Sequence, residues 1–550
     1  MAHFIDERAS LVNDAVEGLV AGSGGALARL DGDPEIRVVL RAEPDPGKVA
    51  VVSGGGSGHE PAHAGFVGPG LLSAAVCGDV FASPSADAVL AGILAVTGEA
   101  GCLLVVKNYA GDRLNFGLAA ERARAAGLRV ETVLVADDIA LPDAKQPRGL
   151  AGTLFVHKVA GHAAASGASL EAVAALARRT AAAARTLGIA VSNATMPGAT
   201  PEPRLAEGQA ELGLGIHGEP GIERIALPPA SALAELMTAR FPAPIAGAGR
   251  LALLVNDLGS TTALEMEVLT KAVLATDLGR RVRLLLGPAR AMTALDMHGA
   301  SLSFLAMDAE IEAVLLAQTP VAAWPRARTL REPLVRPLPE ELGGGLPPTP
   351  SQDAVVAARI EAVCRALIAA EAPLDALDAR VGDGDAGSTF ASEARAVLSE
   401  IDRLPLAEPA PLCRALGERL GRAAGGTSGV LLSIFFSALG SALGDGADWA
   451  KACAAGVQRL RDAGGAGPGD RTLLDALIPA VDALAASGLP EAARAARAGA
   501  EATAGLSRAG TGRSSYLASA DLEGHPDPGA VAVAMAFEAL AASGQRTETA

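Results

Sequence analysis

The sequence predicts a two-part protein, an N-terminal α/β domain followed by an all-α domain, and three observations lead to this fold class. Up to about residue 335, short β-branched runs alternate with Ala-rich segments of helical periodicity, as in an α/β domain. Residues 336–352 (RPLPEELGGGLPPTPSQ) contain five prolines and three glycines, the composition of a linker. Beyond them, Ala/Leu/Arg-rich helical patterns follow one another, which indicates a helical bundle over 353–550.

Within the first part, we expect strands over 48–53, 102–106, 128–135, 251–256 and 281–286, with helices such as 169–187 between them. This alternation predicts a largely parallel sheet. The Gly- and Pro-rich stretch over 190–220 divides residues 1–335 into subdomains of about 1–190 and 191–335. In the second part, residues 423–444 carry no charge and are long enough to span a bilayer. Because they are rich in small residues, we interpret them as a buried helix of a bundle.

Composition excludes several classes of protein. The 550 residues include 46 basic and 62 acidic side chains, a formal net charge of −16, which argues against nucleic acid and anionic membrane surfaces as partners. The five cysteines are scattered and form no CxxC pair, which argues against a disulfide framework or a zinc site and fits a cytoplasmic protein. The N-terminal residues lack an apolar stretch, so we expect no signal peptide.

Three aspartates stand close together in the motif LDARVGDGDAGST, namely Asp378, Asp383 and Asp385. At a helix end followed by a tight Gly turn their carboxylates can converge, and carboxylate oxygens favour Mg²⁺ or Ca²⁺ over zinc. An EF-hand starting at Asp383 is excluded, because it needs an Asx at 387, a Gly at 388 and a Glu at 394, and these positions hold Gly, Ser and Ala. The alternative interpretation is a solvated acidic turn.

The motif GGTSG at 425–429 suits a phosphate at a helix start, although such turns are also common helix caps.

Three Gly-rich polar segments lie in the first part: SGGGSGHEP at 53–61, KNYAGDRLNF at 107–116 and GIHGEPG at 215–221. The first two follow expected strands, and open α/β sheets bind ligands at the carboxyl ends of strands. Neither a GxGxxG fingerprint nor a Walker motif is present in these segments. Each histidine taken alone is more often a hydrogen-bonded structural residue than a catalytic one, but three such loops in one domain favour a binding site.

Together these motifs resemble the single-chain, two-domain family of ATP-dependent dihydroxyacetone kinases. The segments GGGSGHEPAHAGFVG, KNYAGDRLNF, GTLFVHKVAG and LGLGIHGEPG resemble its substrate domain, and LDARVGDGDAGST, GGTSGV, PGDRTLLDAL, GRSSYL and HPDPGA resemble its nucleotide domain. The resemblance covers nearly the whole chain, with the motifs in the family's order. It implies an α/β substrate domain followed by a barrel of eight antiparallel helices that binds ATP.

The resemblance also implies roles for residues of the substrate domain. His217 would attack the substrate carbonyl and form a covalent hemiaminal, as a neutral imidazole can, and His59 and Asp112 would be acid/base partners. Glycerol, which has no carbonyl, could not form this adduct. The residues expected to line the substrate are Gly56, Ser57, Gly58, His59, Lys107 and Asp112.

In the helical domain, the resemblance implies that Asp378, Asp383 and Asp385 hold two Mg²⁺ ions against the phosphates of ATP, which suits phosphoryl transfer. The expected nucleotide contacts are Ala386, Gly387, Ser388, Thr389, Thr427, Ser428, Gly464, Leu473, Arg513, Asp527, Pro528 and Gly529. The family further implies a domain-swapped homodimer, in which one chain's nucleotide domain serves its partner's substrate domain.

Other functions stay open at this stage. The same mechanism could act on another short ketose or aldose, such as erythrulose or glyceraldehyde. Some animal relatives also cyclise FAD at the nucleotide site. A non-catalytic ketose sensor is disfavoured by the presence of His217, Asp112 and the three aspartates, and a separate-subunit, phosphocarrier-dependent system is disfavoured by the fusion of both domains.

Overall fold

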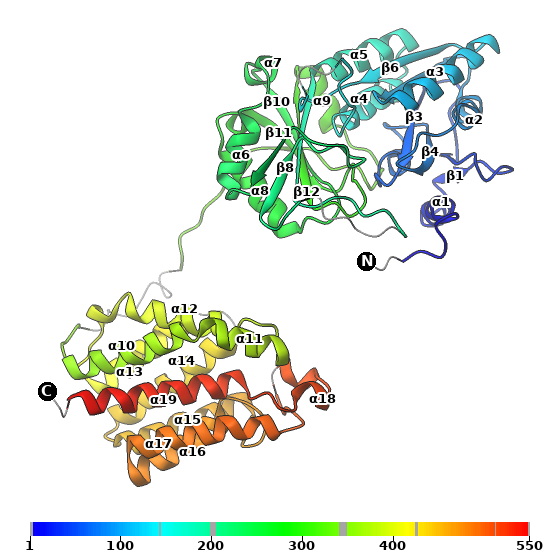
Figure 1. Cartoon of the computed structure of the whole chain (residues 1–550). Coiled ribbons are helices and arrows are strands. Elements are labelled where there is room, and N and C mark those ends of the chain that lie inside the picture. The colour runs from blue at the N-terminus through cyan, green and yellow to red at the C-terminus, as the bar shows by residue number, and fades with distance from the viewer. Residues whose placement is uncertain are drawn as a thin grey trace. The chain divides into compact units, whose positions relative to one another are not determined.

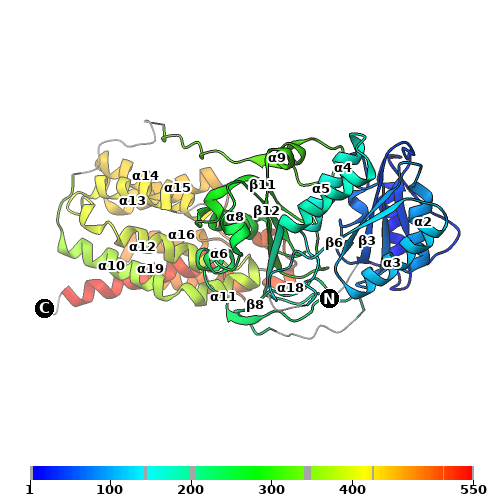
Figure 2. The same ribbon diagram turned by 90° about the horizontal axis from the view of Figure 1, so that it is seen from above.

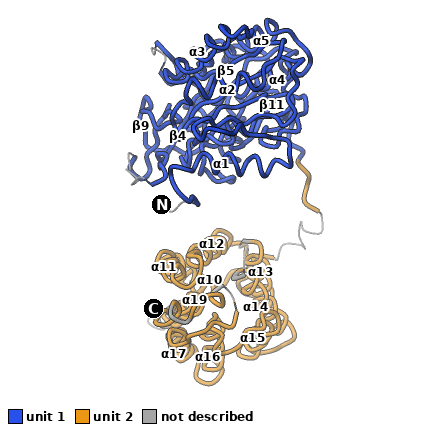
Figure 3. Tube along the Cα trace, turned by 90° about the vertical axis from the view of Figure 1, so that its right-hand side faces the viewer, with its two compact units in different colours: residues 1–334 blue, residues 335–550 orange. Residues whose placement is uncertain are grey.

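A computed structural model describes residues 4–141, 145–198, 205–339, 349–423, 427–511 and 513–547. The chain divides into two compact units, Met1–Leu334 and Val335–Ala550 (Figures 1 and 3). Of the expected linker, residues 340–348 lie outside the described residues, and residues 336–339 form no helix or strand.

The first sheet of unit 1 has six strands in the order β1-β2-β4-β3-β5-β6. Their bounds are β1 (Leu27–Arg29), β2 (Val38–Arg41), β3 (Ala50–Ser57), β4 (Ala74–Val80), β5 (Cys102–Lys107) and β6 (Val130–Val135). The strands β4, β3, β5 and β6 pair in parallel with one another, whereas β2 pairs antiparallel with both β1 and β4 at one edge. The parallel strands β3 and β5 therefore end at the same edge; β3 continues past residue 53 to Ser57, within the SGGGSGHEP segment, and β5 ends at Lys107, the first residue of KNYAGD.

The second sheet has seven strands in the order β13-β11-β10-β12-β7-β8-β9. Their bounds are β7 (Ala184–Ala190), β8 (Gln209–Leu212), β9 (Glu223–Ala226), β10 (Leu251–Asp257), β11 (Val282–Ala289), β12 (Gly299–Ala306) and β13 (Arg328–Thr329). Only β10 and β11 are paired in parallel; the other pairs among the described residues are antiparallel. The expectation of a largely parallel arrangement is wrong for this sheet. Parallel neighbours need crossover connections, usually helices, whereas β12, β7, β8 and β9 run antiparallel to one another.

The strand β7 corrects two further expectations. The helix expected over 169–187 ends at Ala183, and the chain continues directly into β7, which pairs with β12. Because β7 already belongs to the second sheet, the chain changes sheets before the subdomain boundary expected near residue 190. Alanine fits both helix and buried strand, so the composition of this segment does not mark the transition.

Unit 1 is built in five layers (Figures 1 and 2). The outer helices α2 (Ala86–Val96) and α3 (Ala110–Ala125) cover one face of the first sheet. The helices α4 (Thr153–Ala165), α5 (Leu170–Ala183) and α9 (Ala309–Leu316) share a core with both sheets. The helices α6 (Ala230–Thr238) and α8 (Ala263–Ala275) cover the outer face of the second sheet. In addition, α1 (Leu11–Ala21) and the short α7 (Ala243–Ala246) lie in unit 1.

Alternation along β3 explains this layering. Val49 and Val51 belong to the core shared with α4 and α5, whereas Ala50 and Val52 belong to the core shared with α2 and α3. Side chains of a strand point alternately to the two faces of a sheet, so a continuous apolar run buries both faces at once.

Unit 2 is helical, as the sequence predicts, and eight of its helices pack side by side in a closed ring (Figure 3). In ring order each helix contacts the next, and the last contacts the first: α10 (Ala354–Ala369), α12 (Ala386–Leu398), α13 (Pro409–Ala423), α14 (Thr427–Gly444), α15 (Trp449–Gly464), α16 (Leu474–Ser487), α17 (Leu489–Ala502) and α19 (Pro528–Thr547). The helix α11 (Glu371–Val381) packs against α12, and the short α18 (Ser519–Leu522) precedes α19.

The uncharged segment over 423–444 corresponds to α14, which packs between α13 and α15. Within the described ranges, none of the helices combines the length and the apolar character needed to cross a membrane. This finding agrees with the interpretation of the segment as a helix of the bundle.

Candidate active site

The structure brings together two histidines that lie 158 residues apart in the sequence. His59 follows the end of β3 and is fully buried, and His217 lies in the turn between β8 and β9 with 18% of its side chain exposed. Their Nε2 atoms are 3.0 Å apart. The rings of Phe81 and Tyr109 pack around the pair, with centroids 5.4 Å and 4.6 Å from that of His217.

The partners of the two Nδ1 atoms determine where the ring protons lie. The Nδ1 atom of His59 is 2.7 Å from the carbonyl oxygen of Thr293, and that of His217 is 3.1 Å from Oε1 of Glu219. Since a carbonyl and a carboxylate only accept, both Nδ1 atoms donate. The facing Nε2 atoms would then present two lone pairs to each other, so their 3.0 Å contact requires one shared proton.

Electrostatics around the pair support this assignment. Burial, together with the charges of Lys107 and His217, lowers the pKa of His59 well below its usual value. Burial alone would raise the pKa of Glu219, but hydrogen bonding with His217 and its charge outweigh burial and lower that pKa to about 2. Glu219 is therefore an anion that can balance positive charge on the pair, and His59 is a ring that carries its proton on Nδ1 and turns the lone pair of Nε2 toward His217.

The loop that carries His59 is held from the second sheet. The backbone N–H of Leu295 donates to the carbonyl of Gly58 at 2.8 Å, and the Thr293 N–H donates to the carbonyl of His59 at 3.1 Å. Asn256, fully buried at the end of β10, in turn bonds the backbone of Ala291 and Met292. The position of His59 therefore depends on contacts between the two sheets.

Asp112 and Lys107 lie on the KNYAGD segment and are buried. Asp112 is in the first turn of α3, where its Oδ1 accepts a 2.5 Å hydrogen bond from the hydroxyl of Ser83. The ammonium group of Lys107 has no hydrogen-bond partner among the described residues and lies 5.8 Å from the centre of the Tyr109 ring. Burial lowers the pKa of Lys107, while Asp112 and Glu219 oppose that effect.

Two glycines among the expected substrate-lining residues allow the backbone to pass close to Phe81. A Cβ atom at Gly56 would lie 2.8 Å from the backbone nitrogen of Ala82, and one at Gly58 would lie 2.8 Å from Cε1 of Phe81. Gly58 also has a φ of +97°, which L-residues avoid. Ser57, between them, donates to the Gly78 carbonyl at 2.8 Å and thereby joins β3 to the end of β4.

In unit 2, the three predicted metal ligands converge. Asp378 is buried near the end of α11, and Asp383 and Asp385 are exposed in the turn before α12. One carboxylate oxygen from each lies within 4.8 Å of the others. The Oδ2 atom of Asp378 also accepts backbone N–H groups of residues 384, 385 and 386, which shapes the turn. A set of three carboxylates fits a hard divalent cation such as Mg²⁺.

Several expected nucleotide contacts lie at the same end of unit 2. Burial raises the pKa of Asp527 to about 7, with Asp475 and Asp378 adding to the effect and Arg471 opposing it. Asp527 is therefore close to the metal-binding turn. A Cβ atom at Gly529 would lie 3.4 Å from that of Leu473, so the start of α19 and the start of α16 are adjacent; Pro528 opens α19.

The other expected nucleotide contacts differ in what the structure shows. Ser388 is engaged with Asp375, to which its hydroxyl donates at 2.6 Å. Ala386, Gly387 and Thr389 form the first turn of α12, and Gly464 ends α15. The side chains of Thr427, Ser428 and Arg513, and residues 424–426, lie outside the described part of the structure. The hydroxyl of Ser514, next to Arg513, donates to the Val381 carbonyl at 2.8 Å, which places that segment beside the metal-binding turn.

Sequence reasoning missed three residues that orient the side chains of the candidate site: Glu219 and Thr293 contact the histidine pair, and Ser83 contacts Asp112. Glu219 could have been recognised, because it stands two residues after His217 in GIHGEPG and a carboxylate is a usual partner for Nδ1. Thr293 acts through its backbone carbonyl, and Ser83 through a common hydroxyl, so neither leaves a motif in the sequence.

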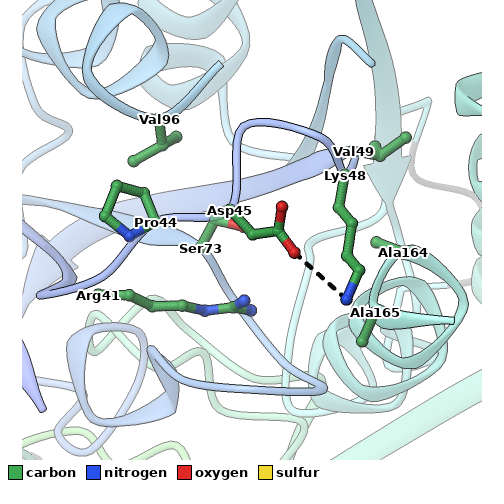
Figure 4. A pocket seen from close by; sticks show the side chains of 9 residues that line it. All are labelled: Arg41, Pro44, Asp45, Lys48, Val49, Ser73, Val96, Ala164 and Ala165. Atoms are coloured by element: carbon green, nitrogen blue, oxygen red, sulfur yellow. Dashed lines mark ion pairs between the residues drawn. The ribbon is translucent and has the colours of Figure 1, made fainter. Parts of the chain in front are cut away.

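A small pocket in unit 1 lies away from this site (Figure 4). An ion pair between Lys48 and Asp45, 3.3 Å apart, lies in it, and about 20 Å³ is open to water-sized molecules. That is enough for roughly one water molecule and too little for a metabolite.

Comparison with known proteins follows the same two-part division. A Dak1 domain matches residues 17–323, and a DAK2 domain matches residues 380–542. The chain is 48% identical over 546 residues to a dihydroxyacetone kinase of Citrobacter freundii, covering 98% of this chain and 99% of that protein. It is 41% identical over 568 residues to a triokinase/FMN cyclase of Mus musculus, covering 96% of both.

Among solved structures, the dihydroxyacetone kinase from C. freundii in complex with AMP-PNP and Mg²⁺ has a TM-score of 0.68 and 46% identity, covering 98% of this chain and 99% of that one. The motifs, the two units and these full-length similarities agree. The chain belongs to the single-chain, two-domain family of ATP-dependent dihydroxyacetone kinases.

Proposed function

We propose that this protein transfers the γ-phosphoryl group of ATP to dihydroxyacetone, held as a covalent hemiaminal on His217, and releases dihydroxyacetone phosphate. The observation that supports the mechanism is the pairing of His59 with His217, whose Nε2 atoms lie 3.0 Å apart while each Nδ1 atom faces a fixed acceptor.

This arrangement supplies the proton that hemiaminal formation needs. The shared proton moves to Nε2 of His59, and the lone pair of His217 Nε2 attacks the carbonyl carbon. A C–N bond forms, the C=O π bond breaks, and the resulting alkoxide takes the proton from His59 Nε2. The resulting hemiaminal carries a hydroxyl on the former carbonyl carbon, and the His217 ring becomes an imidazolium. Its positive charge lies next to the Glu219 carboxylate. Protons and charge balance without a further acid.

Phosphoryl transfer then requires a base at the substrate hydroxyl. Asp112 is buried with one oxygen held by Ser83, so its other oxygen can accept the proton of the attacking hydroxyl. Asp378, Asp383 and Asp385 would hold two Mg²⁺ ions, which supply charge neutralisation at the phosphates when bound. The turn before α12 and the starts of α16 and α19 would surround the nucleotide.

The experiment that tests the function is turnover by the purified chain alone, with ATP and Mg²⁺ and a panel of dihydroxyacetone, erythrulose, glyceraldehyde and glycerol. We expect phosphorylation of dihydroxyacetone and no phosphorylation of glycerol, which lacks a carbonyl. Preference for erythrulose or glyceraldehyde would change the substrate but keep the mechanism, whereas absence of ATP consumption with every carbonyl substrate would contradict the proposal.

His217→Ala tests the covalent step directly. Intact-protein mass spectrometry of the wild type with dihydroxyacetone should show a mass increase equal to that of the substrate, and the variant should show none. An adduct of unchanged mass and yield on the variant would exclude His217 as the nucleophile.

We also propose that the active form is a domain-swapped homodimer, on the basis of the resemblance. Mixing the inactive variants His217→Ala and Asp383→Ala tests this arrangement, because activity can return only if the intact nucleotide domain of one chain serves the intact substrate domain of the other. A mixture that stays inactive while each variant forms dimers would contradict the swap.

A second activity is suggested by one observation, the 41% full-length identity to a triokinase/FMN cyclase. Incubation of the chain with FAD and a divalent metal, followed by chromatography of the flavins, would show whether a cyclic flavin phosphate forms.

A further inference from the structure

His63 lies four residues after His59 and has no role in the chemistry described above. It directly precedes the short 3₁₀ helix η1 (Ala64–Phe66) and is 5% exposed. Both of its ring nitrogens are buried, and neither has a hydrogen-bond partner among the residues that the structure describes. An unpaired buried polar group destabilises the folded state, so native proteins pair nearly all of them.

The neighbours of His63 define its charge and its position. Burial and the nearby charge of Lys107 lower its pKa well below the usual value, so the ring is neutral and carries one N–H and one lone pair. On one side it packs edge-on against His157, with ring centroids 5.2 Å apart. His157 is itself fixed, because its Nε2 lies 3.1 Å from the hydroxyl oxygen of Ser53, which donates to the Val105 carbonyl.

On its other side, His63 approaches Lys107 beside Gly55. A Cβ atom added to Gly55 would lie 3.1 Å from the Lys107 ammonium nitrogen and 3.6 Å from Nε2 of His63. Two buried polar atoms without hydrogen-bond partners among the described residues therefore lie near each other on the same side of the β3 backbone. Gly55 immediately precedes the expected substrate-lining residues 56–59, so both atoms lie next to the candidate site.

The two groups differ in what they can recognise. The ammonium group of Lys107 only donates hydrogen bonds, and a neutral imidazole nitrogen with a lone pair accepts one. A ligand hydroxyl satisfies both at once, because its oxygen accepts from Lys107 while its hydrogen is donated to His63. A methyl group or a hydrogen at that place satisfies neither.

We propose that His63 is a specificity-determining residue, which together with Lys107 binds the hydroxyl of the ketose that is not phosphorylated. The inference rests on the proposed function, since it assigns the second hydroxyl of that substrate. Asp112 faces the hydroxyl that is phosphorylated, and the histidine pair binds the carbonyl carbon between the two. The three polar groups of dihydroxyacetone thus each have a separate recognition element.

The test compares dihydroxyacetone with hydroxyacetone, which differs from it only by lacking one hydroxyl. In the wild type we expect a higher kcat/KM for dihydroxyacetone. In His63→Leu, kcat/KM for dihydroxyacetone should fall while that for hydroxyacetone changes little, so that the ratio of the two falls by roughly 10- to 100-fold. His162→Leu, a half-buried histidine on α4 with a lowered pKa, is the matched control and should leave the ratio unchanged.

The outcomes separate this inference from the proposed function. Failure of the wild type to phosphorylate either ketone contradicts the proposed function. A wild type that turns over dihydroxyacetone, with an unchanged ratio in His63→Leu, overturns the specificity role and leaves His63 as a packing partner of His157. If His63→Leu unfolds, His63→Phe is measured in its place, and a ratio equal to the wild-type value overturns the inference.

Discussion

Glu219→Gln is the sharpest test of the histidine pair, because it changes one atom of the acceptor that fixes His217. In the wild type, Oε2 of Glu219 accepts the backbone N–H of His217 at 2.9 Å and Oε1 accepts from Nδ1 at 3.1 Å. Glutamine has one oxygen and one NH₂ group. If its oxygen keeps the backbone bond, its NH₂ faces Nδ1 and selects the tautomer with hydrogen on Nε2, which removes the nucleophilic lone pair.

The pKa of Glu219 sets the magnitude of the effect. Its lowering from 4.5 to about 2 corresponds to roughly 3.4 kcal/mol at about 1.4 kcal/mol per unit, which is an upper limit. Because 33% of the side chain is exposed, solvent screening reduces this to about 1–2 kcal/mol, or roughly 5- to 30-fold. The tautomer change adds to the loss, so we expect kcat/KM for dihydroxyacetone to fall about 100-fold.

The assay is steady-state kinetics with saturating ATP and Mg²⁺, accompanied by intact-mass measurement of the adduct. Glu223→Gln is the matched control, since Glu223 lies four residues further on and pairs with Arg240 at the surface at 2.9 Å; it should retain wild-type kinetics. The variant and the wild type should bind ATP equally well. If Glu219→Gln keeps kcat/KM and adduct yield within threefold of the wild type, the assignment of tautomers and of the shared proton is wrong.

Three further predictions concern stability, backbone and metal. Burial raises the pKa of Glu393 on α12 from 4.5 to about 7. Between these two pH values the folded state binds more protons than the unfolded state, so the free energy of unfolding falls as pH rises. Glu393→Gln should therefore raise the free energy of unfolding of unit 2 by up to about 3 kcal/mol at pH 8 and by much less at pH 5, measured by thermal or urea unfolding. Gly58→Ala should raise KM for the ketone at least tenfold while ATP binding measured by calorimetry stays unchanged, because the methyl group meets Phe81 and the φ of +97° opposes it; wild-type KM would show that the loop adapts. Asp383→Asn should shift the Mg²⁺ dependence of turnover to at least tenfold higher concentrations in a metal titration, and an unchanged curve would exclude Asp383 as a ligand.

The sequence predicts strands whose residues are β-branched, and it fails where alanine and glycine dominate. The strands β5 and β10 start where expected, at residues 102 and 251. By contrast, β7 (ARTLGIA) and β12 (GASLSFLA) pair with each other in the middle of the second sheet, and neither was expected as a strand. Their burial between layers, which is a tertiary effect, stabilises them as strands although their local composition is ambiguous.

For the candidate site, too, the sequence predicts some of the residues and misses others. Motifs identify His59, His217 and Asp112, because a histidine or aspartate in a Gly-rich loop after a strand is chemically conspicuous. They do not identify Thr293, which supplies a backbone carbonyl from 234 residues further along the chain. The sequence therefore predicts which side chains form the candidate site but not which groups orient them, because orientation depends on how the two sheets meet.

The positions of the acidic residues also change what the net charge implies about binding of ATP. A net charge of −16 argues against polyanionic partners, and yet ATP is a polyanion. At the metal-binding end of unit 2 the carboxylates of Asp378, Asp383 and Asp385 converge, and Asp527 and Asp475 lie nearby. The guanidinium group of Arg471, also at this end, donates to the backbone carbonyls of Leu522 and His525 and is not free to neutralise a phosphate. Repulsion between these carboxylates and free ATP therefore has to be offset by a divalent cation, so the acidity of this end favours the metal complex of the nucleotide over the nucleotide alone.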